Sequence, residues 1–193
     1  MNKFYTSDLH LGHDKLIEYL PKTRGHFANA DEMNSIIISR WNSTVKHEDI
    51  VYFLGDFSVG APPEKIPGMV ASLYGQKHMI LGNHDMNKLE WHELAPWVSI
   101  QHELYIEDNG RKVWLNHFPY GPKWDKRGLI RPEPTQPFDI ALAGHSHDKY
   151  FLNTAGSINV GVDLLDFYPK TLNELLELAK IAIPFDINTK LII

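Results

Sequence analysis

Residues 139–147 read DIALAGHSH, an apolar run that ends at a glycine and two histidines. A short apolar run bounded by polar residues is typical of a buried β-strand. In an extended backbone, side chains at positions i and i+2 lie on one face, so we expect His145 and His147 to point toward the same place. Two adjacent imidazoles suggest metal ligands, although the pair alone fits polar loop residues equally well.

Four other segments of the chain share this design. Each becomes apolar and then ends in Asp, Asn or His, as a buried strand would if its carboxyl end carried a metal ligand. The segments are KFYTSDLH at 3–10, DIVYFLGDF at 49–57, KHMILGNHD at 77–85 and KVWLNHF at 112–118. Together with 139–147 they predict five strand ends with ligand-type side chains.

Helical patterns lie between these strands. In residues 29–41, Asn29 and Glu32 form a capping-box pattern ahead of apolar residues at helical spacing, and Thr171 and Glu174 do the same ahead of a leucine-rich stripe. Weaker helical patterns occupy 62–75, where Pro and Gly interrupt the pattern, and 86–94.

Residues 102–116 predict a β-hairpin, because Asn109-Gly110 fits a type I′ turn between two strand-like arms. A further strand pair is expected within 149–163. Strands mixed with helices in this way predict an α/β protein with mixed sheets.

Composition limits the class of protein. The 193 residues are 43% hydrophobic, with no internal repeat or linker, which predicts a single domain over residues 1–193. The lack of cysteine excludes thiolate ligands and fits a reducing cytoplasm. No stretch resembles a signal peptide or a membrane helix, so we expect no membrane partner and a cytoplasmic location. The formal charge of −5 argues against duplex nucleic acid as a partner.

The strand ends offer more ligands than one metal ion uses. Asp8 and His10 repeat the i, i+2 spacing of the histidine pair, and Asp56, Asn83 and His117 add one donor each. Two ions that share a carboxylate would use all seven, as in two-metal phosphoesterases. A bridge is expected to need two oxygens and therefore to be an Asp, and of the two Asp residues in the set we favour Asp56. Two dications with only two carboxylates leave positive charge that suits a phosphate and acidifies bound water.

The full set of motifs resembles a known family. Asp8-x-His10, Gly55-Asp56, Gly82-Asn83-His84-Asp85, His117 and Gly144-His145-x-His147 are similar, in order and loop context, to the signature of the calcineurin-like metallophosphoesterase superfamily, especially its small bacterial and phage members. The resemblance spans residues 8–147. It implies a four-layer α/β/β/α sandwich with two mixed β-sheets flanked by helices and a site at the strand ends.

The resemblance also implies roles for individual residues. The first ion would be held by Asp8, His10, Asp56 and His147, and the second by Asp56, Asn83, His117 and His145. His84 would face the substrate as general acid or transition-state stabiliser, with Asp85 orienting it. The implied mechanism is in-line attack of a metal-bound hydroxide on phosphorus. Nitrogen and oxygen ligands fit Mn²⁺, Fe, Zn, Co or Ni, and we expect Mn²⁺ to support activity.

Substrate contacts are expected outside the ligand set. His13 is close enough to His10 in sequence to line the pocket, or it is a structural histidine. Arg24 could grip a phosphate. In the segment 121–134, Trp124 and Arg127 could stack a base and hold its phosphates, while an ordinary solvated loop fits the same residues.

The leading functional hypothesis is a metal-dependent phosphodiesterase for small or nucleotide-type substrates. The alternatives are a phosphomonoesterase, a nuclease acting on single-stranded ends, and a non-catalytic scaffold. A scaffold is disfavoured because every ligand and His84 are present. The sequence predicts neither the physiological ester nor the oligomeric state.

Overall fold

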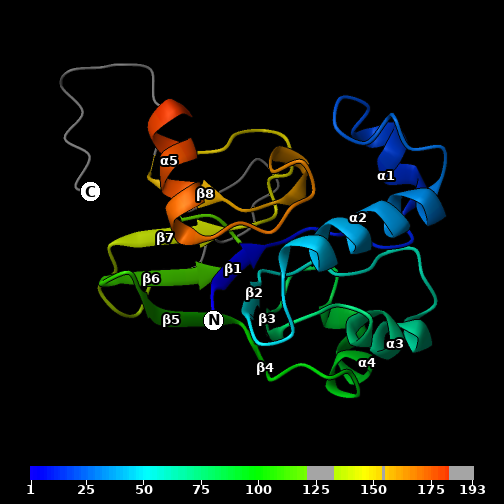
Figure 1. Ribbon diagram of the computed structural model, residues 1–193, viewed down its shortest axis with the longest axis horizontal. Coiled ribbons are helices and arrows are strands. Elements are labelled where there is room, and N and C mark those ends of the chain that lie inside the picture. Colours follow the sequence, from blue (N-terminus) through cyan, green and yellow to red (C-terminus); the bar gives the residue numbers. More distant parts are fainter. Residues whose placement is uncertain (121–132, 154, 183–193) are drawn as a thin grey trace.

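The computed structural model describes residues 1–120, 133–153 and 155–182. Within these residues, two four-stranded sheets form the centre of the protein (Figure 1). The first sheet has the order β1 (Lys3–Thr6), β2 (Ile50–Phe53), β3 (Gln76–Ile80) and β4 (Ser99–Gln101). The second has the order β5 (Glu103–Asp108), β6 (Arg111–Asn116), β7 (Ile140–Ala143) and β8 (Ser157–Asn159).

Strand direction places the loops that carry the candidate ligands next to one another. The three pairs of the first sheet are parallel, and an isolated antiparallel bridge joins Tyr5 to Lys170. The second sheet is mixed, since β5 and β6 are antiparallel whereas β6–β7 and β7–β8 are parallel. Parallel strands end at the same edge of a sheet, so the loops after β1, β2 and β3 lie together, as do those after β6 and β7.

Helices flank the sheets as predicted. Figure 1 shows α1, α2, α3 and α4 on the side of the first sheet, and α5 near β7, β8 and β1. No helix of the described residues is long and apolar enough to span a bilayer. The bounds are α1 Asp14–Tyr19, α2 Ala30–Thr44, α3 Ile66–Ala71, α4 Leu89–Glu93 and α5 Leu172–Ala182, with 3₁₀ turns at Pro63–Lys65, Met86–Lys88 and Val162–Leu164.

Both predicted capping boxes are present. The Asn29 side chain accepts the Glu32 N–H at 2.9 Å, and the Glu32 carboxylate accepts the Ala28 N–H at 2.6 Å. At α5, the Glu174 carboxylate accepts the Thr171 N–H at 2.8 Å. Each cap satisfies backbone donors that a helix start leaves without partners, which explains why both helices begin where the sequence indicated.

The core has two apolar layers, because alternate residues of the parallel strands point to opposite faces. One layer packs the first sheet against α2 and α3, and the other fills the space between the two sheets, where α5 covers the edge beside β1. The first contains Phe4, Val51, Phe53, Met79, Met33, Ile37 and Trp41, and the second contains Tyr5, Tyr52, Leu54, Val113, Leu115, Leu142, Leu172 and Leu175. This is the predicted two-sheet α/β sandwich flanked by helices, except that only the second sheet is mixed, because every strand pair of the first sheet is parallel.

The hairpin is confirmed and the second strand pair only in part. Asn109 and Gly110, with φ of 51° and 72°, connect β5 to β6 in the left-handed conformation that a type I′ turn requires. Within 149–163, β8 forms but its expected partner is reduced to a bridge between Leu152 and Ile158. Backbone bonds still join the two segments, from Asn153 to Ser157 and from Asn159 to Phe151, and the Asn153 side chain also accepts the N–H groups of Ala155 and Ser157.

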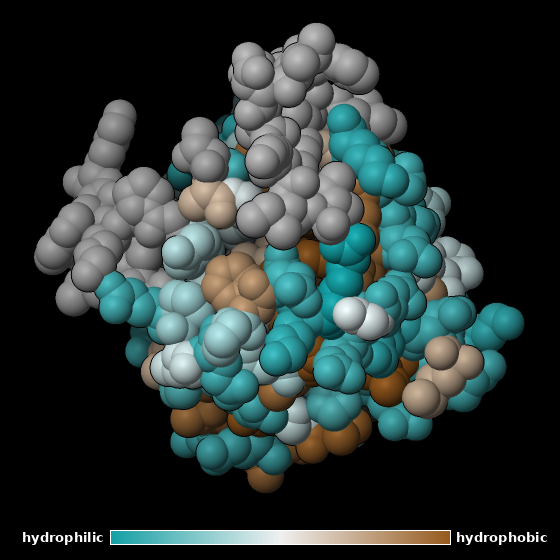
Figure 2. Space-filling view, turned by 90° about the vertical axis from the view of Figure 1, so that its left-hand side faces the viewer, coloured by the Kyte–Doolittle hydropathy of each residue, from teal (hydrophilic) through white to brown (hydrophobic). Residues whose placement is uncertain are grey.

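The surface on the side of the second sheet is mainly polar. Figure 2 shows this face, and hydrophilic side chains cover most of its described part, with apolar residues between them. The apolar side of these strands is therefore used inside the sandwich.

Candidate metal centre

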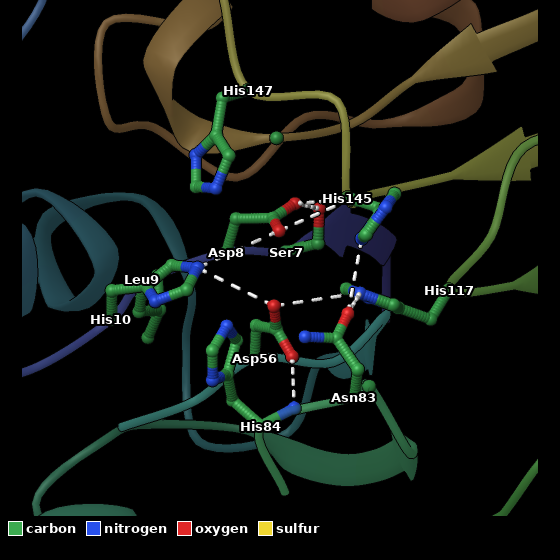
Figure 3. A network of polar contacts seen from close by, with 12 residues as sticks. Ser7, Asp8, Leu9, His10, Asp56, Asn83, His84, His117, His145 and His147 are labelled. Carbon is green, nitrogen blue, oxygen red and sulfur yellow. Dashed lines mark hydrogen bonds and ion pairs between the residues drawn. The ribbon is translucent and has the colours of Figure 1, made fainter. Parts of the chain in front are cut away.

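The predicted ligands converge at the strand ends. Figure 3 shows all seven around a common space, although they come from loops after β1, β2, β3, β6 and β7. Among the described residues, three groups of three side chains each place ligand atoms within 4.8 Å of one another, and two of these groups consist of predicted ligands alone. We call Asp8, His10 and His147 the first cluster and Asp56, His117 and His145 the second cluster. Each is part of one of the two ion-ligand sets implied by the sequence.

Asp56 lies between the two clusters. Its Oδ2 is 3.5 Å from His10 Nε2 and 3.5 Å from His117 Nε2, while its Oδ1 accepts the His84 N–H at 2.9 Å. The sequence argument expected a bridge to use both carboxylate oxygens, but here one oxygen faces both clusters. The second oxygen is occupied by the backbone, which fixes the rotation of the carboxylate.

Asn83 belongs with the second cluster. Its Oδ1 lies 3.2 Å from His117 Nε2 and 3.0 Å from His145 Nδ1. The ring of His117 has a defined tautomer, because its Nδ1 is 2.7 Å from the Leu54 carbonyl, which can only accept a proton. His117 therefore presents Nε2 toward Asp56 and Asn83.

The ligand loops have an unusual backbone. The ligands Asp8, His10, Asp56, His145 and His147 have positive φ values of 59°, 51°, 60°, 67° and 48°. The extended backbone expected at the two i, i+2 pairs is therefore wrong. His145 turns to the second cluster and His147 to the first (Figure 3). A non-glycine residue in this region costs about 1–2 kcal/mol, and such residues concentrate at functional sites.

Asp8 is held by the loop that carries His145. Its carboxylate accepts the His145 N–H at 3.0 Å and the Ser7 hydroxyl at 2.6 Å. Gly144 makes this approach possible, because a Cβ there would lie 2.6 Å from both Asp8 Oδ2 and Ser7 Oγ. The loops after β1 and β7 thus meet without space for any side chain at 144.

We expect Gly144→Ala to weaken metal binding by about 10-fold or more, because the added methyl group displaces the Asp8 carboxylate. Isothermal titration of the metal-stripped protein with Mn²⁺ measures this. Gly68→Ala is the matched control, since a Cβ at this position in α3 has no atom within 4 Å. Equal Mn²⁺ affinity in the two variants would contradict the steric argument.

The chemistry of these residues fits divalent metal ions. His10 is 2% exposed, and both of its ring nitrogens have no hydrogen-bond partner among the described residues. Burial lowers the pKa of His10 to about 4, so its imidazole is neutral. Burial, with the Asp8 and Asp85 carboxylates nearby, raises the pKa of Asp56 to about 6. A cation here would supply both the missing partner and the missing positive charge.

His84 lies beside the first cluster, where the sequence placed a substrate-facing group. Its side chain is exposed, and its ring is edge-on to His10 with a centroid distance of 5.3 Å. One ring nitrogen also lies within 4.8 Å of ligand atoms of His10 and Asp56. The backbone N–H of His84, rather than its ring, makes the bond to Asp56. The imidazole is therefore available to a bound substrate.

Asp85 does not orient His84 as expected. Its Oδ2 accepts the N–H groups of Asp56 at 2.7 Å and Gly82 at 2.9 Å, and its Oδ1 accepts that of Phe57 at 3.0 Å. The fully buried His92 lies 3.4 Å from the same carboxylate. Asp85 thus holds two ligand loops together, because buried backbone N–H groups need acceptors.

The predicted phosphate contact by Arg24 is incompatible with its position. Arg24 is 0% exposed, and its guanidinium donates to Asp163 and to the carbonyls of Asp8 and Leu9. His13 fits its prediction better, since its ring is 5.8 Å from that of His10 and it is half-buried. Trp124 and Arg127 lie outside the described residues.

Asp163 is a buried residue of the centre that sequence reasoning missed. Its carboxylate accepts hydrogen bonds from His147 Nδ1 at 2.8 Å and from Arg24 Nε at 2.6 Å. A signal was present, because SINVGVD at 157–163 is an apolar run that ends in Asp, like the five ligand segments. Applying the same rule there would have identified Asp163.

A model of the calcineurin-like phosphoesterase family matches residues 4–149, a range that contains all seven candidate ligands and His84. The chain belongs to this family. Membership confirms the resemblance inferred from the motifs. It identifies the chain as a hydrolase acting on phosphoester bonds and implies divalent metal ions at the two clusters.

Relatives of this phosphoesterase come from phages and archaea. The gene 66 protein of Mycobacterium phage L5 is 32% identical over 184 residues, covering 84% of this chain and 86% of the relative. An uncharacterized protein of Methanocaldococcus jannaschii is 32% identical over 189 residues, covering 92% of each. A protein of unknown function from Aquifex aeolicus shares the fold, with a TM-score of 0.67, 23% identity, and coverage of 92% of this chain and 98% of that one.

Proposed function

We propose that this phosphoesterase is a phosphodiesterase for small or nucleotide-type substrates, and that it works with two divalent transition-metal ions, for which Mn²⁺ is suitable. The observation that carries the two-ion proposal is the position of Asp56. Its Oδ2 is equally distant, at 3.5 Å, from histidine nitrogens on both sides. A shared carboxylate is the arrangement by which proteins hold two ions at the short separation that in-line displacement uses.

The assignment of ligands follows from the clusters. Asp8, His10 and His147 would hold one ion, Asn83, His117 and His145 the other, and Asp56 would contact both. When bound, such ions acidify a coordinated water and neutralise charge on the phosphoryl oxygens. Protein ligands of only nitrogen and oxygen suit Mn²⁺ and equally Fe, Zn, Co or Ni.

Two histidines outside the ligand set, His84 and His13, are proposed to contact the ester. His84 is fixed by its backbone bond to Asp56, and its exposed imidazole can donate a proton to the leaving oxygen. The ring of His13 lies 5.8 Å from that of His10, and we propose that it contacts the outer group of the ester.

Charge favours a diester over a monoester. The guanidinium of Arg24, the expected phosphate grip, is neutralised by Asp163 and lies away from the surface. A diester carries one negative charge and a monoester up to two, so a diester needs fewer cationic contacts. The net charge of −5 also speaks against long nucleic-acid substrates.

The test compares chromogenic esters that share a leaving group, p-nitrophenyl phosphate and bis-p-nitrophenyl phosphate. Metal-stripped protein is assayed with and without added Mn²⁺. We expect turnover only with metal, and a kcat/KM at least about tenfold higher for the diester, a difference of about 1.4 kcal/mol in barrier. A higher monoester rate would make the protein a phosphatase, and cleavage confined to single-stranded oligonucleotides would make it a nuclease. Two bound ions with no turnover would indicate a binding role.

A further inference from the structure

A buried ion pair lies behind the first cluster. Arg24 is 0% exposed and Asp163 is 6% exposed. The pair is bidentate, with Arg24 Nε 2.6 Å from Asp163 Oδ1 and Nη2 3.1 Å from Oδ2. Removing a pair of charges from water is costly, and a buried pair by itself is weak evidence for stability. The other contacts of the Arg24–Asp163 pair indicate a role in the metal centre rather than in stability.

Both partners of this pair reach the loops of the first cluster. Asp163 Oδ2 is 2.8 Å from His147 Nδ1. Arg24 Nη2 donates to the Asp8 carbonyl at 2.8 Å, and Nη1 donates to the Leu9 carbonyl at 3.0 Å. The pair therefore connects the loop that carries Asp8 and His10 to the loop that carries His147.

The contact with Asp163 fixes how His147 presents its ring. A carboxylate that receives two guanidinium bonds acts as an acceptor, so Nδ1 of His147 carries the proton. Nε2 is then the ligand atom, and Figure 3 shows the ring pointing toward Asp8 and His10. A carboxylate behind a ligating histidine fixes its orientation and raises its basicity.

The second cluster is supported differently. His117 is oriented by the neutral carbonyl of Leu54, and His145 lies 3.0 Å from the neutral amide oxygen of Asn83. The Arg24–Asp163 pair, in contrast, contacts the loops of the first cluster, through His147 Nδ1 and the carbonyls of Asp8 and Leu9. We therefore expect unequal responses of the two ions when the Arg24–Asp163 pair is changed.

We propose that Arg24 and Asp163 are positioning residues that set the affinity of the ion held by Asp8, His10 and His147, and leave the other ion largely unaffected. The inference rests on the two-ion centre of the proposed function. It differs from a purely stabilising role, which would change the melting temperature of the protein without distinguishing the two ions.

The test is calorimetric titration of metal-stripped Asp163→Asn with Mn²⁺. Asparagine keeps the size of the side chain and removes its charge. We expect the affinity of one ion to fall about 10- to 100-fold and that of the other to stay within about threefold of wild type. Equal loss at both sites, or no loss at either, would overturn the proposal.

A double variant identifies the ion concerned. Asn83→Ala alone should weaken the ion of the second cluster, because Asn83 faces His117 and His145. Combined with Asp163→Asn, it should weaken both ions by about the two single effects, since the sites differ. If the double variant instead keeps one ion at wild-type affinity, both residues serve the same ion and the proposal fails.

Two further measurements remain informative if Asp163→Asn does not fold. Arg24→Lys keeps the charge but cannot make the bidentate contact, and we expect a smaller loss at the same ion. Nitrogen NMR of the metal-free wild type should show His147 protonated on Nδ1, and a ring protonated on Nε2 alone would overturn the proposal. If the wild-type chain binds only one ion, the two-ion function proposed above is wrong. In that case the tautomer of His147 still tests whether Asp163 orients this histidine.

Discussion

Asp56→Asn is expected to weaken the binding of both ions and to reduce Mn²⁺-dependent hydrolysis by about 10³-fold or more, the equivalent of several kcal/mol of transition-state stabilisation. The reason is its position, since one carboxylate oxygen faces His10 and His117. The amide of asparagine can still accept the His84 N–H through its oxygen, so the loop conformation is retained. What the substitution removes is the shared negative charge.

The matched control for this variant is Asp49→Asn. Asp49 is also 2% exposed and also accepts backbone N–H groups, from Asn2 and Lys46, but it lies before β2 at the opposite end of the strand from Asp56. We expect it to retain wild-type ion binding and turnover. If Asp56→Asn lost only one of the two ions, Asp56 would belong to a single site and the bridging role would be wrong.

His84→Ala is expected to lower kcat for diester hydrolysis by about 10²- to 10⁴-fold, the range for loss of a general acid. Both ions should bind with affinities within about threefold of wild type. Alanine keeps the backbone N–H that Asp56 accepts, and the lost imidazole is exposed. Steady-state kinetics and Mn²⁺ titration on the same preparation separate the two effects.

The leaving group tests the acid role of His84. A poor alkoxide leaving group needs the proton more than p-nitrophenolate does, so the loss in kcat should be larger for an alkyl diester. His47→Ala, an exposed histidine on the segment between α2 and β2, is the control and should change neither quantity. Loss of an ion from His84→Ala would make this residue a metal ligand, a role that its distance to His10 and Asp56 allows.

The convergence of the candidate ligands could be predicted from the sequence because it depends on a simple rule. Parallel strands end at one edge, so side chains after the apolar runs at 3–10, 49–57 and 77–85 meet there. The helix caps at Asn29 and Thr171 could be predicted equally well, because each capping pattern is complete within four residues of sequence. Local signals therefore gave the elements and the edge on which the site lies.

The wrong predictions from the sequence have two causes, which are the local backbone conformation and contacts between buried residues that are distant in the sequence. The i, i+2 spacing of His145 and His147 indicated a strand, but both residues have positive φ, which no short pattern distinguishes from an extended loop end. Arg24 was interpreted as a phosphate contact because its actual partner, Asp163, lies 139 residues away in the sequence. Asp85 likewise serves the backbone of a neighbouring loop rather than its sequence neighbour.

The measurement that tests the account most directly follows bound metal and diester turnover together while Mn²⁺ is added to the metal-stripped wild-type protein. If Asp56 joins two ion sites, two ions bind per chain and turnover rises with occupancy of the weaker site. Full turnover at one bound ion per chain would contradict the two-ion centre.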